Sequence, residues 1–331
     1  MTPAEPAPRE IAQLPLAALR RRMEARVLGQ EEFIEHMLIA LLAGGHLLVE
    51  GVPGLAKTRA VKVLGRCLKA SFHRVQFTPD LLPSDLTGTD IFRPQTGEFE
   101  FRAGPIFHNL VLADEINRAS AKVQSALLEA MEERQVTVAE KSWPLPEPFL
   151  VMATQNPIEQ EGAYPLPESQ LDRFLMKTRI SYPSAEQEQR ILELTRREAS
   201  AGATGGSKAE DGYSVEEVMK DRARVLELHL AERLERYIVE LVRATRAPEK
   251  YDGELAGLVS YGASPRASIA LDRCGRARAY LRGRDFVTPG DIQAVAPPVL
   301  RHRIILTYEA EAEGRSSEEV VSRLLDCVAV S

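Results

Sequence analysis

The sequence predicts an α/β domain of parallel-sheet type followed by an all-α domain. Up to about residue 182, short apolar runs of strand length alternate with segments of helical periodicity. This alternation is typical of a parallel sheet with helices on both faces. Beyond residue 183 the apolar positions keep helical spacing. A glycine-bearing turn also joins the first apolar run to the next helix, and turns of this kind bind phosphate groups.

Composition and charge limit the possible classes of function. With 331 residues the chain is long enough for two domains. A formal net charge of −6 argues against a general electrostatic attraction to nucleic acid and leaves room only for a local basic groove. The three cysteines lie far apart without metal-ligand spacing, and no apolar run approaches the length of a membrane span. We therefore expect a cytoplasmic protein.

The elements before the glycine-bearing turn follow from periodicity. Residues 1–13 are proline-rich with little hydrophobic pattern and are expected to form a disordered tail. Apolar positions at helical spacing predict helices over Leu14–Leu28 and Glu31–Ala43. The apolar run His46–Glu50 predicts the first strand, and Arg59–Lys69 predicts the helix after the turn.

The middle of the α/β domain contains two predicted insertions. A second strand is expected at His73–Phe77. The stretch Thr78–Leu110 is longer than a crossover needs, and its alternating pattern predicts a helix interrupted by a β-hairpin. An apolar strand then ends in Asp114 and Glu115, and a helix is expected over Ser120–Glu133. A second hairpin is expected over Gln135–Pro146.

The last elements complete the sheet and begin the helical half. A buried strand is expected at Phe149–Thr154, and a short helix followed by a last strand through Ile180. The two domains are expected to cover residues 14–182 and 183–331. The helical half is expected to contain the helices Ala185–Ala199, Ser214–Leu230, Glu232–Arg246, Pro265–Arg282, Pro289–Arg301 and Ser316–Val328, without strands.

The turn Gly51-Val52-Pro53-Gly54-Leu55-Ala56-Lys57-Thr58 is close to the phosphate-loop pattern G-x-x-x-x-G-K-[ST]. Backbone N–H groups of such a loop surround the phosphates, Lys57 supplies a mobile cation, and the Thr58 hydroxyl can bind Mg²⁺. Ala56 stands where the pattern has its second glycine. Alanine adopts many backbone conformations, though fewer than glycine, so we expect nucleotide binding to survive.

Acidic and amide side chains follow the next apolar strands. Asp114 and Glu115 lie at the carboxyl end of one strand, where ligands bind in open parallel sheets. Asp114 is a candidate for holding Mg²⁺ through water, and Glu115 for orienting and polarising the attacking water. Asn156 follows a third strand and could position the same water. A helix-capping acidic pair and a turn asparagine are the alternative interpretations.

Several motifs in a fixed order make the sequence resemble the MoxR family of AAA+ ATPases. The match covers roughly residues 14–304, and the combination of motifs discriminates far better than any one of them. The motifs that carry it are Gly51–Thr58, Leu110–Ala119, Ala153–Pro157 and Gln170–Phe174, with support from Phe77–Asp85, Ala263–Ala267 and Val295–Arg303.

The resemblance implies a ring-forming, usually hexameric ATPase with an α-helical lid and ATP bound between neighbouring subunits. It implies that Lys57 and Thr58 are the Walker A residues, that Asp114 and Glu115 are the Walker B pair, and that Asn156 is the sensor 1 residue. Thr58 and Asp114 would then be the side chains that face Mg²⁺.

Two arginines acquire roles only through the resemblance. Arg173 resembles the arginine finger that reaches a neighbour's γ-phosphate, and Arg266 resembles the sensor 2 arginine of the lid. Two guanidinium groups can stabilise the charge on a transferring phosphoryl group. Without the resemblance, a surface salt bridge with Asp172 and a helix-start arginine would be the simpler interpretations. Arg118 is a further candidate for the subunit interface.

The resemblance also implies a biological role. Members of the family couple hydrolysis of ATP, with Mg²⁺, to chaperone-like remodelling or activation of partner complexes, and their usual partners contain a von Willebrand factor A domain. The hairpin insertions would face partners or the central pore. A nucleic-acid motor, an ATPase subunit similar to that of magnesium chelatase and a binding-only scaffold are alternatives. The acidic charge disfavours the first, and the lack of an extra domain disfavours the second.

Overall fold

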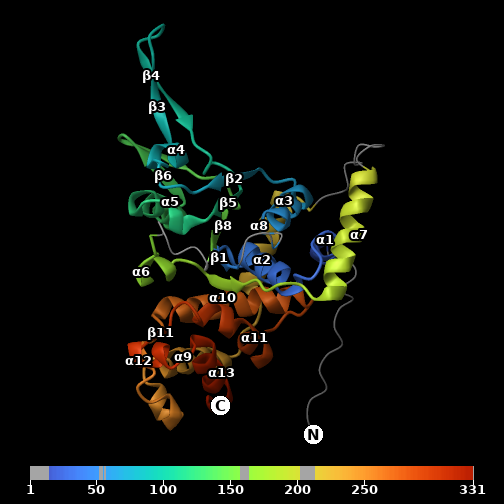
Figure 1. Ribbon diagram of the computed structural model, residues 1–331, viewed down its shortest axis with the longest axis vertical. Helices are drawn as coiled ribbons and strands as arrows, with labels where there is room; N and C mark the ends of the chain where they lie inside the picture. Colours follow the sequence, from blue (N-terminus) through green and yellow to red (C-terminus); the bar gives the residue numbers. More distant parts are fainter. Residues whose placement is uncertain (1–14, 52–54, 56, 157–163, 202–212, 331) are drawn as a thin grey trace. The chain divides into compact units, whose positions relative to one another are not determined.

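The computed structural model describes residues 15–51, 55, 57–156, 164–201 and 213–330 (Figure 1). It contains two compact units. The first comprises Leu19–Phe174 and Thr178–Met219, and the second comprises Leu175–Lys177, the stretch from Lys220 onward and the described part of Met1–Ala18. The expected tail at residues 1–13 lies outside the described residues. The expected domain boundary at residue 182 stays a prediction.

A five-stranded sheet in the order β2-β5-β8-β1-β9 organises the first unit. Parallel pairing joins β2 to β5, β5 to β8 and β8 to β1. The register places Ala113 opposite Ala153, so the carboxyl ends of β5 and β8 lie side by side. The strands are β1 (Leu47–Glu50), β2 (Phe72–Gln76), β5 (Leu110–Asp114), β8 (Leu150–Gln155) and β9 (Met176–Arg179).

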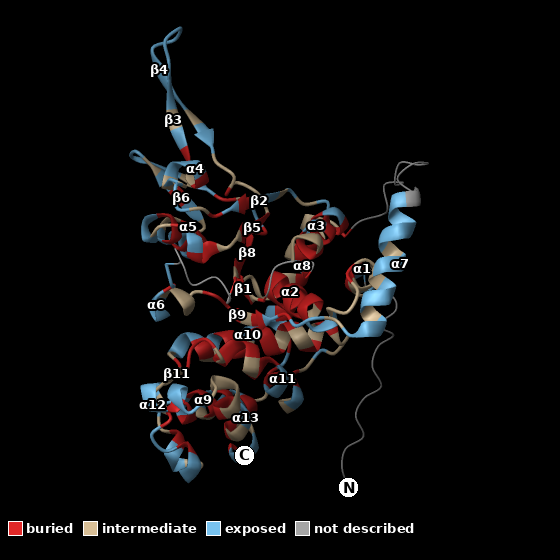
Figure 2. Ribbon diagram, in the orientation of Figure 1, coloured by how far each residue is buried: buried red, intermediate tan, exposed pale blue. Residues whose placement is uncertain are grey.

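Helices cover both faces of this sheet, as the sequence predicts. Side chains alternate between faces along a strand, so Val111 and Leu110 of β5 point in opposite directions. Val111 belongs to the core cluster that includes Leu127 of α5 (Ala121–Glu133). On the other face, Gly65 of α3 (Lys57–Leu68) lies so close that a Cβ there would be 3.5 Å from Leu110 Cδ1. The central strands are buried (Figure 2).

Further helices complete this part of the chain. The short helix α4 precedes the first hairpin, and the short helix α6 precedes β9. They are α1 (Pro15–Glu24), α2 (Glu31–Ala43), α4 (Pro83–Thr87), α6 (Glu168–Leu171) and α7 (Ala185–Ala201), with a 3₁₀ helix at Ile116–Arg118.

Both predicted hairpins are confirmed. One consists of β3 (Gly88–Arg93) and β4 (Glu98–Ala103), and the other of β6 (Gln135–Val138) and β7 (Lys141–Pro144). The β3–β4 hairpin extends away from the central sheet and is largely exposed (Figures 1 and 2). Its exposed Phe99 is 5.3 Å from Phe92, measured between ring centroids.

A ring stack joins the two hairpins. Phe101 of β4 lies parallel to Trp143 of β7, with 4.4 Å between ring centroids and an interplanar angle of 14°. Phe101 also meets Phe107 edge-on. Because stacked aromatic pairs add to the stability of the surfaces that they bury, this contact fixes the base of the long hairpin against the short one.

The second unit is helical, which confirms the predicted fold of this half. The sequence did not predict several short elements of this unit, namely an antiparallel pair of β10 (Val259–Tyr261) and β11 (Ile305–Leu306), the helix α12 and the two 3₁₀ helices. Strands of two or three residues are too short to display a period, which explains the difference. The helices are α8 (Val215–Glu227), α9 (Glu232–Ala244), α10 (Pro265–Leu281), α11 (Pro289–Leu300), α12 (Tyr308–Ala312) and α13 (Ser317–Cys327), with 3₁₀ helices at Pro248–Lys250 and Gly253–Leu255.

A buried carboxylate ties α10 to the start of α11. Asp291 is fully buried and accepts hydrogen bonds from Arg278, Arg284 and Thr288. Burial raises the pKa of Asp291, but the hydrogen bonds from Arg284 and Thr288 outweigh burial and hold it below its ordinary value.

Among the helices that the structure describes, none combines the length and apolar character needed to cross a bilayer.

Candidate nucleotide-binding site

The phosphate-loop segment joins β1 to α3. Its residues Val52, Pro53, Gly54 and Ala56 lie outside the described residues, whereas Gly51, Leu55, Lys57 and Thr58 are described. A Cβ on Gly51 would be 2.9 Å from the carbonyl oxygen of Ile180, so only glycine fits this close approach without a shift of the backbone. Leu55 is buried, and Lys57 and Thr58 are the first two residues of α3.

Lys57 lies among opposite charges. Its Nζ donates to the carbonyl oxygen of Gly51. Burial lowers the pKa of Lys57 below its ordinary value, and the carboxylates of Asp114 and Glu115 oppose that shift. The fold therefore brings the predicted loop lysine within electrostatic range of both predicted acidic residues, which follow a different strand.

Thr154 links the two acidic residues. Its side chain is buried, and its Oγ1 donates to Asp114 Oδ1 at 2.6 Å. The same oxygen accepts a hydrogen bond from the backbone N–H of Glu115 at 2.9 Å. Sequence reasoning did not assign this role to Thr154. The available signal was a single hydroxyl in an otherwise apolar strand, which requires a hydrogen-bonding partner when it is buried.

The backbone at Glu115 has a left-handed conformation with φ of 57°. Residues other than glycine adopt this region infrequently, and such outliers concentrate at functional sites. The Glu115 carboxylate is held through Oε2, which accepts from Gln76 Nε2 at 2.8 Å and from Arg118 Nη1 at 3.2 Å. Arg118, a predicted interface residue, thus contacts Glu115 within its own chain.

Asn156 lies at the same edge of the sheet. It directly follows β8, whose Ala153 is opposite Ala113 of β5, and its side chain is buried. The carboxyl ends of β5 and β8 therefore bring Asp114, Glu115 and Asn156 to the same edge of the sheet, and the role of Asn156 stays a prediction.

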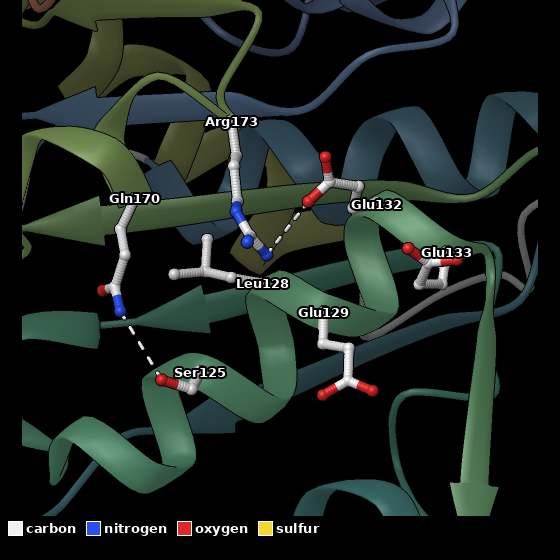
Figure 3. A pocket seen from close by; sticks show the side chains of 7 residues that line it. All are labelled: Ser125, Leu128, Glu129, Glu132, Glu133, Gln170 and Arg173. Atoms are coloured by element: carbon white, nitrogen blue, oxygen red, sulfur yellow. Dashed lines mark hydrogen bonds and ion pairs between the residues drawn. The ribbon is translucent and has the colours of Figure 1, made fainter.

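Arg173 has a different partner from the one that its sequence neighbour suggested. Its Nη1 is 3.2 Å from Glu132 Oε2 of α5, and the two side chains are about one third exposed, at 32% and 35%. Figure 3 shows the arginine above the end of α5, where it lines a surface hollow with Ser125, Leu128 and Gln170. The observed ion pair joins Arg173 to Glu132 rather than to the adjacent Asp172.

Arg266 belongs to the second unit. It is the second residue of α10, is exposed, and has a backbone N–H that donates to the capping hydroxyl of Ser264 at 3.1 Å. Ser264 thus supplies the capping oxygen at the start of α10. The predicted role of Arg266 at the nucleotide stays a prediction.

The donors at the loop and the acidic strand end fit Mg²⁺ rather than a transition metal. In the described part of the chain, no group of three or more histidine, cysteine or acidic side chains could enclose a metal ion. Magnesium usually takes only one or two protein ligands and fills its octahedron with water and phosphate oxygens. Asp114 and the Thr58 hydroxyl supply that kind of oxygen donor set.

Comparison with known proteins agrees with this geometry. Residues 46–176 match the family described as "ATPase family associated with various cellular activities (AAA)", and residues 256–324 match "AAA lid domain". Chaperone MoxR1 of Mycobacterium tuberculosis is 47% identical over 92% of this chain and 79% of its own length. Protein MoxR of Paracoccus denitrificans is 33% identical over 87% of this chain and 88% of its own.

A solved structure shows the same fold over almost the whole chain. A crystal structure from Cytophaga hutchinsonii superposes with a TM-score of 0.86 at 46% identity, covering 97% of this chain and 98% of that one. The two family matches lie within the α/β part and the helical part of the chain, and the relatives cover both parts together. The chain therefore belongs to the MoxR family of chaperone-like AAA+ ATPases.

Proposed function

We propose that the chain hydrolyses ATP to ADP and phosphate, with Mg²⁺, at the interfaces of a homohexameric ring in the cytoplasm. The observation that carries this proposal is the cluster of Lys57, Asp114 and Glu115 at the carboxyl edge of the sheet, in which Thr154 links the two acidic residues. A phosphate-binding cation, a metal-side carboxylate and a water-side carboxylate are the parts that phosphoryl transfer to water requires.

Each side chain of the cluster has a distinct part in this reaction. Lys57 would bind the phosphates, and Asp114 and the Thr58 hydroxyl would hold the metal through oxygen donors. Bound Mg²⁺ would neutralise charge on the phosphate oxygens. Glu115 accepts a hydrogen bond from the attacking water and polarises it, and the Asn156 amide orients the same water.

The arginines complete the site in the proposed ring. Arg173 of one subunit extends toward the γ-phosphate bound by its neighbour, where a guanidinium stabilises charge that grows in the transition state. The partial exposure of the Arg173 side chain beside α5 supports this role, because an arginine finger must extend from the surface of its own subunit to reach the nucleotide of the next one. Arg266 is proposed to contact the nucleotide from the lid.

Hydrolysis is proposed to drive remodelling or activation of a partner complex that contains a von Willebrand factor A domain. The family resemblance supports this partner class, and the name of the Mycobacterium tuberculosis relative, a chaperone, supports the type of activity. The exposed aromatic residues of the β3–β4 hairpin offer contact area for such a partner.

Size measurement tests the ring. The purified chain carrying Glu115→Gln, which is expected to hold ATP without turnover, should sediment as a hexamer with ATP and Mg²⁺. Adding the partner domain should shift this species further, while the nucleotide-free chain should bind that domain less tightly. A chain that remains monomeric at every concentration with ATP bound would contradict the ring. A hexamer that does not bind the von Willebrand factor A domain would contradict the proposed class of partner.

Thr154→Val tests the link between the acidic residues. Valine has nearly the same shape but removes the hydroxyl that holds Asp114 Oδ1 and the N–H of Glu115. We expect kcat to fall about tenfold, equivalent to about 1.4 kcal/mol of transition-state stabilisation. Thr178→Val is the matched control, because Thr178 is also buried in a strand and loses one hydrogen bond, to His36 Nδ1. Equal rates for the two variants would show that Thr154 matters only for stability.

A further inference from the structure

Two polar side chains of β2 contact the acidic pair from the side. The strand order places β2 at an edge of the sheet, next to β5, with Gln76 opposite Asp114. Arg74 and Gln76 are two residues apart, so their side chains lie on the same face. Neither residue is part of the phosphate loop or of the acidic motif.

Arg74 connects the metal-side carboxylate to Gln76. Its Nε and Nη2 donate to Asp114 Oδ2 at 3.0 and 2.6 Å. The same Nη2 donates to Gln76 Oε1 at 2.7 Å. Gln76 Nε2 then donates to Glu115 Oε2 at 2.8 Å. Four side chains therefore form one continuous hydrogen-bonded series from Asp114 to Glu115.

The chemistry of the two ends determines the orientation of the amide between them. A guanidinium only donates hydrogen bonds, so it must face the amide oxygen of Gln76. An ionised carboxylate only accepts, so Glu115 must face the amide nitrogen. Without Arg74 the amide oxygen of Gln76 loses its donor in this series, and the amide is held only by its contact with Glu115.

The series also has a fixed point. Asp114 Oδ1 is held by Thr154, whose side chain is buried in the central strand β8. Arg74 is therefore positioned relative to a rigid strand, although its own side chain is 46% exposed. Catalytic side chains keep the geometry that a reaction needs when neighbouring residues hold them by hydrogen bonds.

We propose that Arg74 is a positioning residue that fixes the Gln76 amide and so couples the orientation of Glu115 to that of Asp114. This inference rests on the proposed function, because it assigns Arg74 to the same hydrolytic site. Arg74 touches neither the nucleotide nor the water in this role. Its effect reaches the reaction through Glu115.

Arg74→Met tests the proposal. Methionine keeps much of the length but donates no hydrogen bond, so kcat is expected to fall about tenfold, while KM for ATP changes less than about twofold. Arg74→Lys should restore most of the rate, because a single nitrogen, Nη2, makes both contacts. Arg236→Met is the control, since Arg236 pairs with Glu232 on an exposed face of α9. An unchanged or raised kcat in Arg74→Met would overturn the proposal.

A double-mutant cycle separates positioning from loss of fold stability. Gln76→Met is expected to lower kcat, and the combination with Arg74→Met should lower it no further, because both substitutions break the same series. If the fold-reduction in kcat of the double variant equals the product of the two single-variant reductions, the proposed coupling between Arg74 and Gln76 is overturned. The thermal midpoint of Arg74→Met should stay near that of wild type, since an ion pair whose arginine is 46% exposed adds little to stability.

A crystal structure of Arg74→Met gives a test that does not depend on turnover. We expect the Gln76 side chain, which loses its donor at Oε1, to move away from Glu115, so that the 2.8 Å contact is lost. Retention of that contact would overturn the inference even if hydrolysis is slow. A wild-type chain that hydrolyses no ATP would instead contradict the proposed function, which distinguishes the two failures.

Discussion

Glu115→Gln is expected to bind ATP as tightly as wild type and to hydrolyse it about 10²–10⁴-fold more slowly. Glutamine has the same shape, so its oxygen can still accept from Gln76 and Arg118, as Glu115 Oε2 does. Lys57 and Asp114, which are proposed to bind the phosphates and the metal, are unchanged. Only the negative charge that polarises water is lost.

Phosphate release measures the rate of hydrolysis, and equilibrium binding of a fluorescent ATP analogue measures the affinity for nucleotide. Glu232→Gln, on an exposed helix face, controls for the loss of one negative charge. Weak binding in the Glu115 variant would mean that the carboxylate supports the nucleotide rather than the water. Unchanged turnover would remove Glu115 from the role of base.

Arg173→Ala is expected to lower turnover of the assembled ring about 10³-fold, which is the lower end of the effect of an arginine finger. The cost to folding should be small. Its ion pair with Glu132 is partly exposed, and such pairs contribute about 1 kcal/mol or less. A large loss of rate with little loss of stability would therefore separate a role in catalysis from a structural one.

Mixing the two inactive variants distinguishes action on a neighbour from action within one chain. In a mixed ring, a subunit with Arg173→Ala keeps Glu115, and a neighbour with Glu115→Gln keeps Arg173. Interfaces that combine the intact halves should regain activity. If Arg173 served its own nucleotide, every subunit would lack one group, and mixing would restore nothing.

Local periodicity was enough to predict most of the fold. The apolar runs of β1, β5 and β8 and the alternating hairpins have patterns that a single sequence displays, because burial on one or both faces determines the residue type at each position. The pair β10 and β11 was missed, since its strands have only three and two residues. Pairing between segments that short depends on the surrounding helices.

The candidate site was predicted only where its residues follow recognisable elements. Lys57 begins α3, Asp114 ends β5, and Glu115 and Asn156 directly follow β5 and β8. The sheet brings Lys57, Asp114 and Glu115 into electrostatic range. The contact of Arg74 with Asp114 depends on β2 lying beside β5, which the residues of β2 do not encode locally.

The ion pair of Arg173 escaped prediction for a similar reason. Its partner Glu132 comes from α5, far away in the sequence, whereas sequence proximity pointed to the adjacent Asp172. Contacts between side chains of different elements follow from tertiary packing, and here the packing of α5 determined that Arg173 pairs with Glu132.

The stack of Phe101 on Trp143 provides an optical probe. Trp143 is the single tryptophan of the chain, and it lies where the two hairpins meet. Intrinsic tryptophan fluorescence of the unmodified protein therefore comes from this junction alone. Any rearrangement of the hairpins during a nucleotide cycle would change the emission of one fluorophore at a known place, without labelling and without background from the helical unit.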